Sequence, residues 1–106
     1  MTTFDNREKA FEAGFAHQQE VEFKAAVRRD RVVGQWAGEK LGLTGDALQA
    51  YVSSIVRADL REAGDGDVYE KIVADFAEKG LDILPSEVRA HMDAAFEAAK
   101  ADALKS

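Results

Sequence analysis

The amino-acid sequence predicts an all-α protein, a small antiparallel four-helix bundle with a mobile N-terminal segment. Between glycine-containing breaks, the large apolar residues recur at intervals of three and four, which is the spacing of one buried helix face. No stretch shows the alternation of apolar and polar residues, rich in β-branched side chains, that a strand needs. The breaks are short and lie at residues 41–46, 62–67 and 78–85, which favours antiparallel packing of neighbouring helices.

The first predicted element is the longest, and it carries two separate apolar stripes. On a helical wheel, Phe4, Phe11 and Phe15 fall within about 40° of one another. A second stripe, rotated by roughly 70°, contains Phe23, Ala26, Val27, Val33, Ala37 and Leu41. Residues 17–20, between the stripes, include no large apolar residue. We therefore expect a packed helix from about Glu20 to Leu41, and a flexible segment, residues 1–18, that precedes a body formed by residues 19–106.

Capping signals mark the other three helices. The second follows Thr44, a suitable N-cap, and ends before Gly64, where a left-handed conformation is favoured. The third is expected to start at Asp67, with Glu70 three residues later as in a capping box, and to end at Gly80. The fourth starts at Pro85.

Aromatic and branched aliphatic side chains supply the predicted core. The apolar face of the second helix comprises Leu48, Val52, Ile55, Val56, Leu60 and Ala63. The bulkiest core residues are expected to be Trp36, Tyr51, Tyr69, Phe76 and Phe96.

The charge balance argues against nucleic acid as a partner. The 106 residues form one small domain with a net charge of −6, from 14 basic and 20 acidic residues, whereas nucleic-acid binding normally needs a cationic surface. Four basic residues lie close together in the sequence: Lys24, Arg28, Arg29 and Arg31. We interpret them as a solvated helix face; the alternatives are a contact surface for a protein partner or, less favoured, a nucleic-acid patch.

The sequence contains no recognisable catalytic or metal-binding motif. It has no cysteine, and its two histidines, His17 and His91, form no metal-ligand pair. Residues 34–41 resemble a phosphate loop only faintly, because Leu41 stands where the hydroxyl is needed. Residues 65–70 likewise lack the oxygen ligands of a calcium loop. We expect no enzyme activity, no metal and no cofactor, and we expect His91 at the surface or boundary of the body.

Five stretches carry a resemblance to a known family. They are FDNREKAFEAGFAH (4–17), FKAAVRRDRVVGQWA (23–37), GLTG (42–45), DLREAGDGDV (59–68) and KIVADF (71–76). Together they resemble the zeta subunit family of alphaproteobacterial F-type ATP synthases over nearly the whole chain. The resemblance weakens at Leu84 and Pro85, where a polar cap is expected.

The resemblance implies an inhibitor of ATP hydrolysis with a globular four-helix body and a mobile N-terminal segment. The segment would enter, as a helix, a catalytic interface between the alpha and beta subunits of the soluble head, near the rotating gamma subunit. The location implied is cytoplasmic and peripheral to the inner membrane, without direct membrane insertion. The partner-binding residues implied are Phe4, Asp5, Arg7, Glu8, Phe11, Glu12, Phe15 and His17.

Simple energetics suggest that this segment needs a partner to become helical. Burying three phenylalanines contributes roughly 5–9 kcal/mol, whereas ordering the segment's backbone costs on the order of 15 kcal/mol. We therefore expect helix-in-groove binding with the phenylalanines as anchors. A further hypothesis is that the charge of His17 makes docking sensitive to pH.

Three alternatives remain open at this point. The phenylalanines would complete the core of the bundle if the segment folded back. The protein would otherwise be a regulatory adaptor, or a small helical module that binds an adenine nucleotide through Arg28, Arg29 and Trp36.

Overall fold

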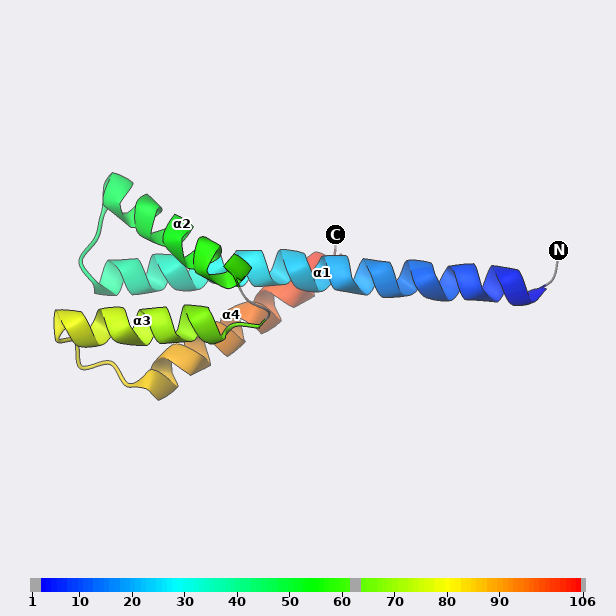
Figure 1. Cartoon of the computed structure of the whole chain (residues 1–106). Helices are drawn as coiled ribbons and strands as arrows, with labels where there is room; N and C mark the ends of the chain where they lie inside the picture. Colours follow the sequence, from blue (N-terminus) through cyan, green and yellow to red (C-terminus); the bar gives the residue numbers. More distant parts are fainter. Residues whose placement is uncertain (1–2, 62–63, 106) are drawn as a thin grey trace.

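The computed structural model describes the backbone of residues 3–61 and 64–105, and the side chains of residues 19–60 and 64–104. In this part of the chain, four α-helices follow one another: α1 (Thr3–Lys40), α2 (Gly45–Arg61), α3 (Gly66–Lys79) and α4 (Pro85–Lys105). Helix α1 packs mainly against α2 and α4, and α3 lies against α2 and α4. The predicted all-α, four-helix fold is confirmed (Figure 1).

Helix α1 extends well beyond the other three helices (Figure 1). The molecule measures 65 × 26 × 23 Å, because the N-terminal part of this 38-residue helix projects away from the body. The helix begins at Thr3, whereas the sequence predicted a start at about Glu20. Extending an existing helix adds one hydrogen bond for each residue fixed and avoids the cost of nucleation. The packed part of α1 can therefore continue into residues that would not form a helix alone.

The ends of the helices follow the capping signals, with one exception. Gly64 and Gly80 have φ angles of 88° and 76°, as expected of left-handed residues. The N–H of Leu81 donates to the carbonyl of Phe76 at 3.0 Å and closes α3. Pro85 is the first residue of α4. The prediction that Asp67 caps α3 is wrong, because Asp65 occupies the cap position and Asp67 lies in the first turn.

The core lies where all four helices meet. Its buried members are Val33, Ala37, Ile55, Val68, Ile72, Phe76, Val88 and Met92. Trp36, Tyr51 and Tyr69 are partly buried against this cluster, and the Trp36 ring meets the Phe76 ring edge-on at 5.5 Å between centroids. Four of the five predicted aromatic residues thus belong to the core or its edge.

Three residues predicted to face the core do not. Leu60 and Phe23 are 62% and 59% exposed, and Phe96 is half-buried outside the core cluster. The physical reason is that charged side chains, described below, occupy the space between the helices at this level. Ala63, also assigned to the apolar face of α2, lies outside the described residues.

Glycines allow α1 and α2 to approach closely. A Cβ atom at Gly34 would lie 3.2 Å from the Cα of Val52, and one at Gly38 would meet the side chain of Leu48. Both glycines therefore fit a tight contact between the two helices, in the part of α1 that belongs to the body.

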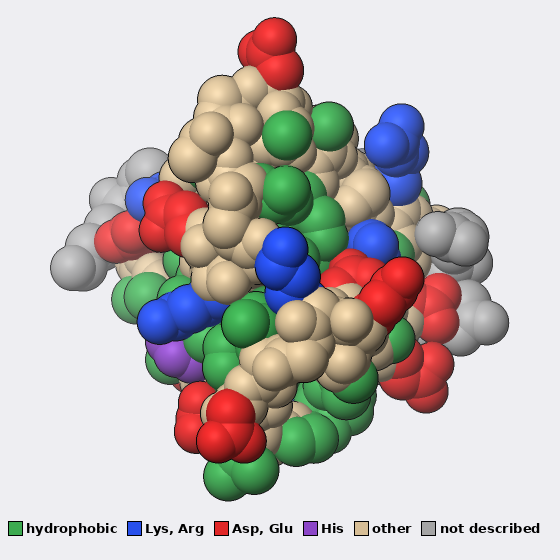
Figure 2. Space-filling model, turned by 90° about the vertical axis from the view of Figure 1, so that its left-hand side faces the viewer, with side chains coloured by type: hydrophobic (Ala, Val, Ile, Leu, Met, Phe, Trp, Pro, Cys, Tyr) green, Lys and Arg blue, Asp and Glu red, His purple; other side chains and the backbone are tan. Residues whose placement is uncertain are grey.

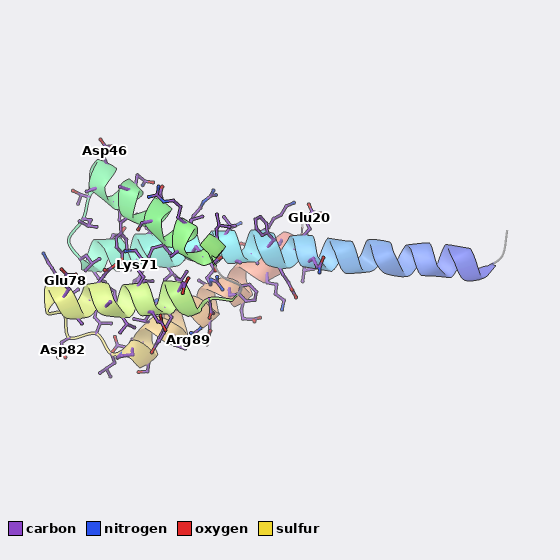
Figure 3. All side chains as sticks on the ribbon, in the orientation of Figure 1. Glu20, Asp46, Lys71, Glu78, Asp82 and Arg89 are labelled. Atoms are coloured by element: carbon purple, nitrogen blue, oxygen red, sulfur yellow. The ribbon has the colours of Figure 1, made fainter. Side chains whose placement is uncertain are left out.

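The end of the body opposite the projecting part of α1 has a mixed surface. Figure 2 shows hydrophobic side chains gathered in the lower half of this face, with acidic groups around its edge. Asp46, Glu78 and Asp82 lie at this end, far from Glu20 at the other end of the body (Figure 3). This end of the body is therefore not uniformly apolar, because acidic side chains border its hydrophobic side chains.

Candidate functional site

The projecting part of α1 carries the predicted partner-binding stretch. The eight predicted contact residues, which fall between Phe4 and His17, all lie on one uninterrupted helix. Their side chains are outside the part of the chain that the structure describes. The spacings of seven and four place Phe4, Phe11 and Phe15 on one face of such a helix. None of the other described helices runs beside this part of α1 (Figure 1). The backbone therefore does not show the fold-back arrangement.

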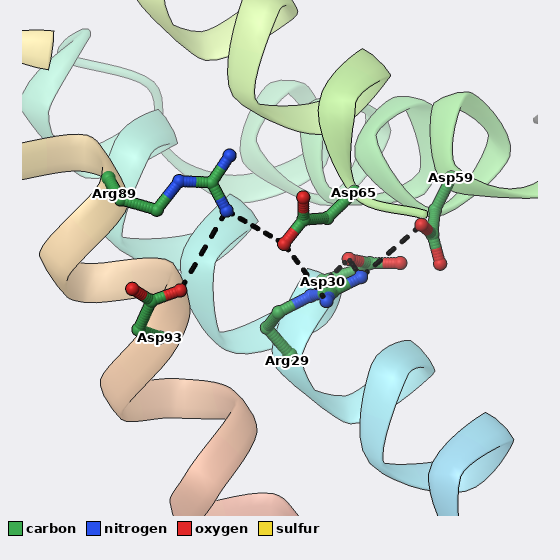
Figure 4. A network of polar contacts seen from close by, with 6 residues as sticks. All are labelled: Arg29, Asp30, Asp59, Asp65, Arg89 and Asp93. Atoms are coloured by element: carbon green, nitrogen blue, oxygen red, sulfur yellow. Dashed lines mark hydrogen bonds and ion pairs between the residues drawn. The ribbon is translucent and has the colours of Figure 1, made fainter. Parts of the chain in front are cut away.

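A cluster of charges joins α1 to the rest of the body. We call it the arginine–aspartate network; its members, drawn in Figure 4, are Arg29, Asp30, Asp59, Asp65, Arg89 and Asp93. Arg29 and Asp30 come from α1 and Asp59 from α2, whereas Asp65 precedes α3 and the last two belong to α4. A single network therefore joins α1, α2, α4 and the turn that precedes α3.

Arg29 is the centre of this network. Its Nη2 atom lies 3.0 Å from Asp30 Oδ1 and 3.2 Å from Asp59 Oδ1, and its Nη1 atom lies 3.7 Å from Asp65 Oδ2. The side chain is only 7% exposed, and its guanidinium carbon sits 5.5 Å from the centroid of the Phe96 ring. Carboxylate partners replace the water that a buried arginine loses, and they stabilise its charge. Losing one partner would leave charge buried without compensation.

Arg89 extends the network to α4. Its Nη1 atom donates to Asp65 Oδ2 at 2.8 Å and lies 3.7 Å from Asp93 Oδ1. The hydrogen bond to Asp65 is the main reason that the pKa of Arg89 is raised. Because the Asp65 carboxylate binds two arginines, it makes no capping hydrogen bond to α3.

Asp30 is the buried acid of the network. Its side chain is fully buried, and its Oδ2 atom has no hydrogen-bond partner. Burial, followed by the neighbouring Asp59 carboxylate, raises the pKa of Asp30 to about 8, although Arg29 acts in the opposite direction. Asp30 therefore holds a proton at neutral pH, and the charges of Arg29 and Arg89 are balanced by Asp59 and Asp65.

The prediction that the four basic residues form a solvated face is wrong for Arg29. Lys24, Arg28 and Arg31 are exposed, with Lys24 paired to Glu20 at 3.1 Å and Arg28 to Asp102 at 3.2 Å. Arg29 precedes the buried Val33 by four residues, so it lies on the buried face of α1. That spacing could have identified its orientation, but not its partners on other helices.

The structure does not bring the candidate nucleotide contacts together. Arg28 pairs with Asp102 at the surface, and Arg29 is committed to the network. Trp36 instead stacks on His91, with ring centroids 3.8 Å apart and an interplanar angle of 19°. His91 is exposed, as predicted. These three residues therefore face different surroundings.

An open apolar hollow adjoins the network, and sequence reasoning missed it. It has a volume of about 670 Å³ and is lined by Glu22, Phe23, Ala26, Arg29, Asp59, Leu60, Gly64, Asp65, Asp93 and Phe96. The sequence indicates this hollow only through Phe23, Leu60 and Phe96, and their helical spacing predicts that they face the core instead.

Comparison with known proteins defines the family. Among the described residues, no group of histidine or acidic side chains could hold a metal ion, and none of the described helices is both long and apolar enough to cross a bilayer. The comparison with curated proteins gives no match. The family of ATPase inhibitor subunit zeta matches residues 1–102, which is nearly the whole chain. The chain therefore belongs to the ATPase inhibitor subunit zeta family.

Proposed function

We propose that this protein inhibits ATP hydrolysis by an F-type ATP synthase through the projecting part of α1. Residues 3–18 enter a catalytic interface between alpha and beta subunits of the soluble head, near the gamma rotor. The observation that carries this proposal is the continuity of α1, which runs as one helix from the packed body to Thr3 without another helix beside its first part. Membership of an inhibitor family supports it independently.

Aromatic anchors account for the affinity of such a contact. Each phenylalanine buried in a partner's groove contributes about 1.5–3 kcal/mol, and Phe4, Phe11 and Phe15 share one helix face. A segment that already extends from a packed helix loses less conformational entropy on binding than a free peptide. The charged residues Asp5, Arg7, Glu8 and Glu12, together with His17, then set register and partner choice more than affinity.

Inhibition of this kind needs no catalytic residue or cofactor in the inhibitor. A catalytic interface must open for the rotor to turn, and a helix wedged in it opposes that opening. The arginine–aspartate network joins α1 to α2, to the turn before α3 and to α4, and it holds the base of the projecting helix in the body. The inhibitor therefore acts as a mechanical block.

Deletion of residues 1–18 tests the proposal. We expect the variant to lose inhibition of ATP hydrolysis by the isolated synthase head, while its melting temperature changes little, because no other described helix runs beside this part of α1. The matched control is Leu104→Ala, which removes an exposed apolar side chain of α4 and should inhibit normally. Retained inhibition by the deletion variant would refute the proposal. A large fall in melting temperature would favour the fold-back arrangement.

A further inference from the structure

We propose that the apolar hollow is a second contact site for the synthase head, and that it binds a segment carrying an apolar side chain next to a lysine or arginine. The inference rests on the proposed function, because it assigns this surface to the same partner that receives the projecting part of α1. It concerns the body of the protein, which the wedge mechanism alone leaves without a contact.

Large apolar side chains from three helices surround the hollow. Phe23 comes from α1, Leu60 from α2 and Phe96 from α4, and the first two are 59% and 62% exposed. Single exposed apolar residues are common on protein surfaces, whereas a cluster around a concave site of about 670 Å³ is typical of a binding surface. An occupant would bury at least these two side chains.

The charges of the hollow favour a cationic occupant. Its lining contains four acidic residues and one basic residue, Arg29. Asp59 and Asp65 are paired with Arg29 and Arg89, so the remaining acidic residues, Glu22 and Asp93, determine the charge that an occupant meets. Arg29 is already bound to carboxylates and covered by the Phe96 ring, so it offers little positive charge to a ligand. The Asp93 side chain is 66% exposed and is 3.7 Å from its arginine partner. A lysine or arginine beside an apolar anchor would complement this rim.

The same charges disfavour the two occupants that this chain could itself supply. A second copy would carry a net charge of −6 to an acidic surface. The N-terminal segment has three acidic residues, Asp5, Glu8 and Glu12, against Arg7 and Lys9, so it does not supply the positive charge either. In addition, its backbone points away from the body as a continuation of α1 (Figure 1).

The position of the hollow indicates that its occupant belongs to the same partner. Phe23 follows Gln18 by five residues on the same helix, which corresponds to about 8 Å along the axis. A protein that encloses residues 4–17 therefore brings its own surface to the edge of the hollow. The two sites would form one continuous interface along α1, with the phenylalanines in the partner's groove and the partner's side chains in the hollow.

Two full-length variants test the hollow without touching the projecting segment. Phe23→Ala removes an apolar contact, and Leu60→Lys adds a charge that repels a cationic occupant. Because both side chains are exposed, neither substitution should lower the melting temperature appreciably. The controls Leu84→Ala and Leu104→Lys make the same changes at positions that are 58% and 66% exposed and lie outside the hollow.

The measurements are binding of the dye-labelled protein to the isolated head and inhibition of its ATP hydrolysis. We expect the dissociation constant to rise about fivefold or more for both hollow variants and to stay within about twofold of the wild type for the controls. Saturating amounts of the hollow variants should still inhibit fully. Unchanged binding of both hollow variants would overturn the second site and leave the proposed function standing. Wild-type protein that binds without inhibiting would instead overturn the proposed function, and weaker binding of the hollow variants would then still support the site.

Discussion

Replacing Asp30 by asparagine tests the buried acid of the arginine–aspartate network without changing its shape. Burial raises the pKa of Asp30 from 3.8 to about 8. Between these two values the folded protein holds a proton that the unfolded chain has released. The folded state then binds more protons than the unfolded state, so the free energy of unfolding falls as the pH rises. The contribution is fully present below about pH 4 and is lost as the pH approaches the folded pKa.

The size of the effect follows from the shift. Each pH unit in this range changes the free energy of unfolding by up to about 1.4 kcal/mol. We expect the total change between pH 5 and pH 8 to be about 2–4 kcal/mol. An asparagine cannot ionise, and it has nearly the same shape as a protonated aspartic acid. The variant should therefore match the wild type only below about pH 4, and its advantage in stability should grow steadily from pH 5 to pH 8.

Urea unfolding of both proteins at pH 5, 6.5 and 8 measures this difference. The control is Asp93→Asn, which makes the same substitution at a side chain that is 66% exposed and should leave the pH dependence nearly unchanged. Equal m-values would show that the unfolding reactions are comparable. Parallel pH profiles for wild type and Asp30→Asn would refute the reasoning, because Asp30 would then be ionised throughout as the partner of Arg29.

Two further changes test the packing and the turn that hold the body together. Phe76→Ala removes the largest fully buried side chain and should lower the free energy of unfolding by about 3–5 kcal/mol in urea titrations; a loss below about 1 kcal/mol would contradict its place in the core. Gly80→Ala places a side chain at a φ of 76° and should cost about 1–2 kcal/mol, measured as a lower melting temperature, whereas an unchanged or higher value would show that the left-handed turn is not required.

Local signals predicted most helix ends, since each depends on residues that are neighbours in sequence. Gly80 ends α3 and Pro85 begins α4 as expected. The start of α3 could not be predicted in this way, because Asp65 and Asp67 have the same capping chemistry. The cap position fell to Asp65, whose carboxylate is held by Arg89 from 24 residues away. Only the packing of α4 against this turn places that arginine beside it.

Helical spacing predicted which residues share a face, but not what lies opposite that face. Phe23, Leu60 and Phe96 satisfy the spacing and nevertheless surround an open hollow. At this level of the bundle, Arg29 and Asp30 occupy the buried face of α1. A periodicity argument treats charged residues as solvent-facing, so it could predict neither the buried pair nor the displacement of the apolar residues to the surface.

The network also explains how one helix can belong both to a stable body and to the proposed wedge. A 16-residue peptide is marginal as an isolated helix, and Gly14 weakens it further by about 1 kcal/mol relative to alanine. Arg29 is bonded to α2 and to the turn before α3, about 17 Å along the axis from residue 18. Helix formation in residues 3–18 then needs only propagation from the packed part of α1 that the network holds in the body. The packed part of α1 thus nucleates the helix and sets its direction. The projecting residues provide the proposed contacts with the synthase head.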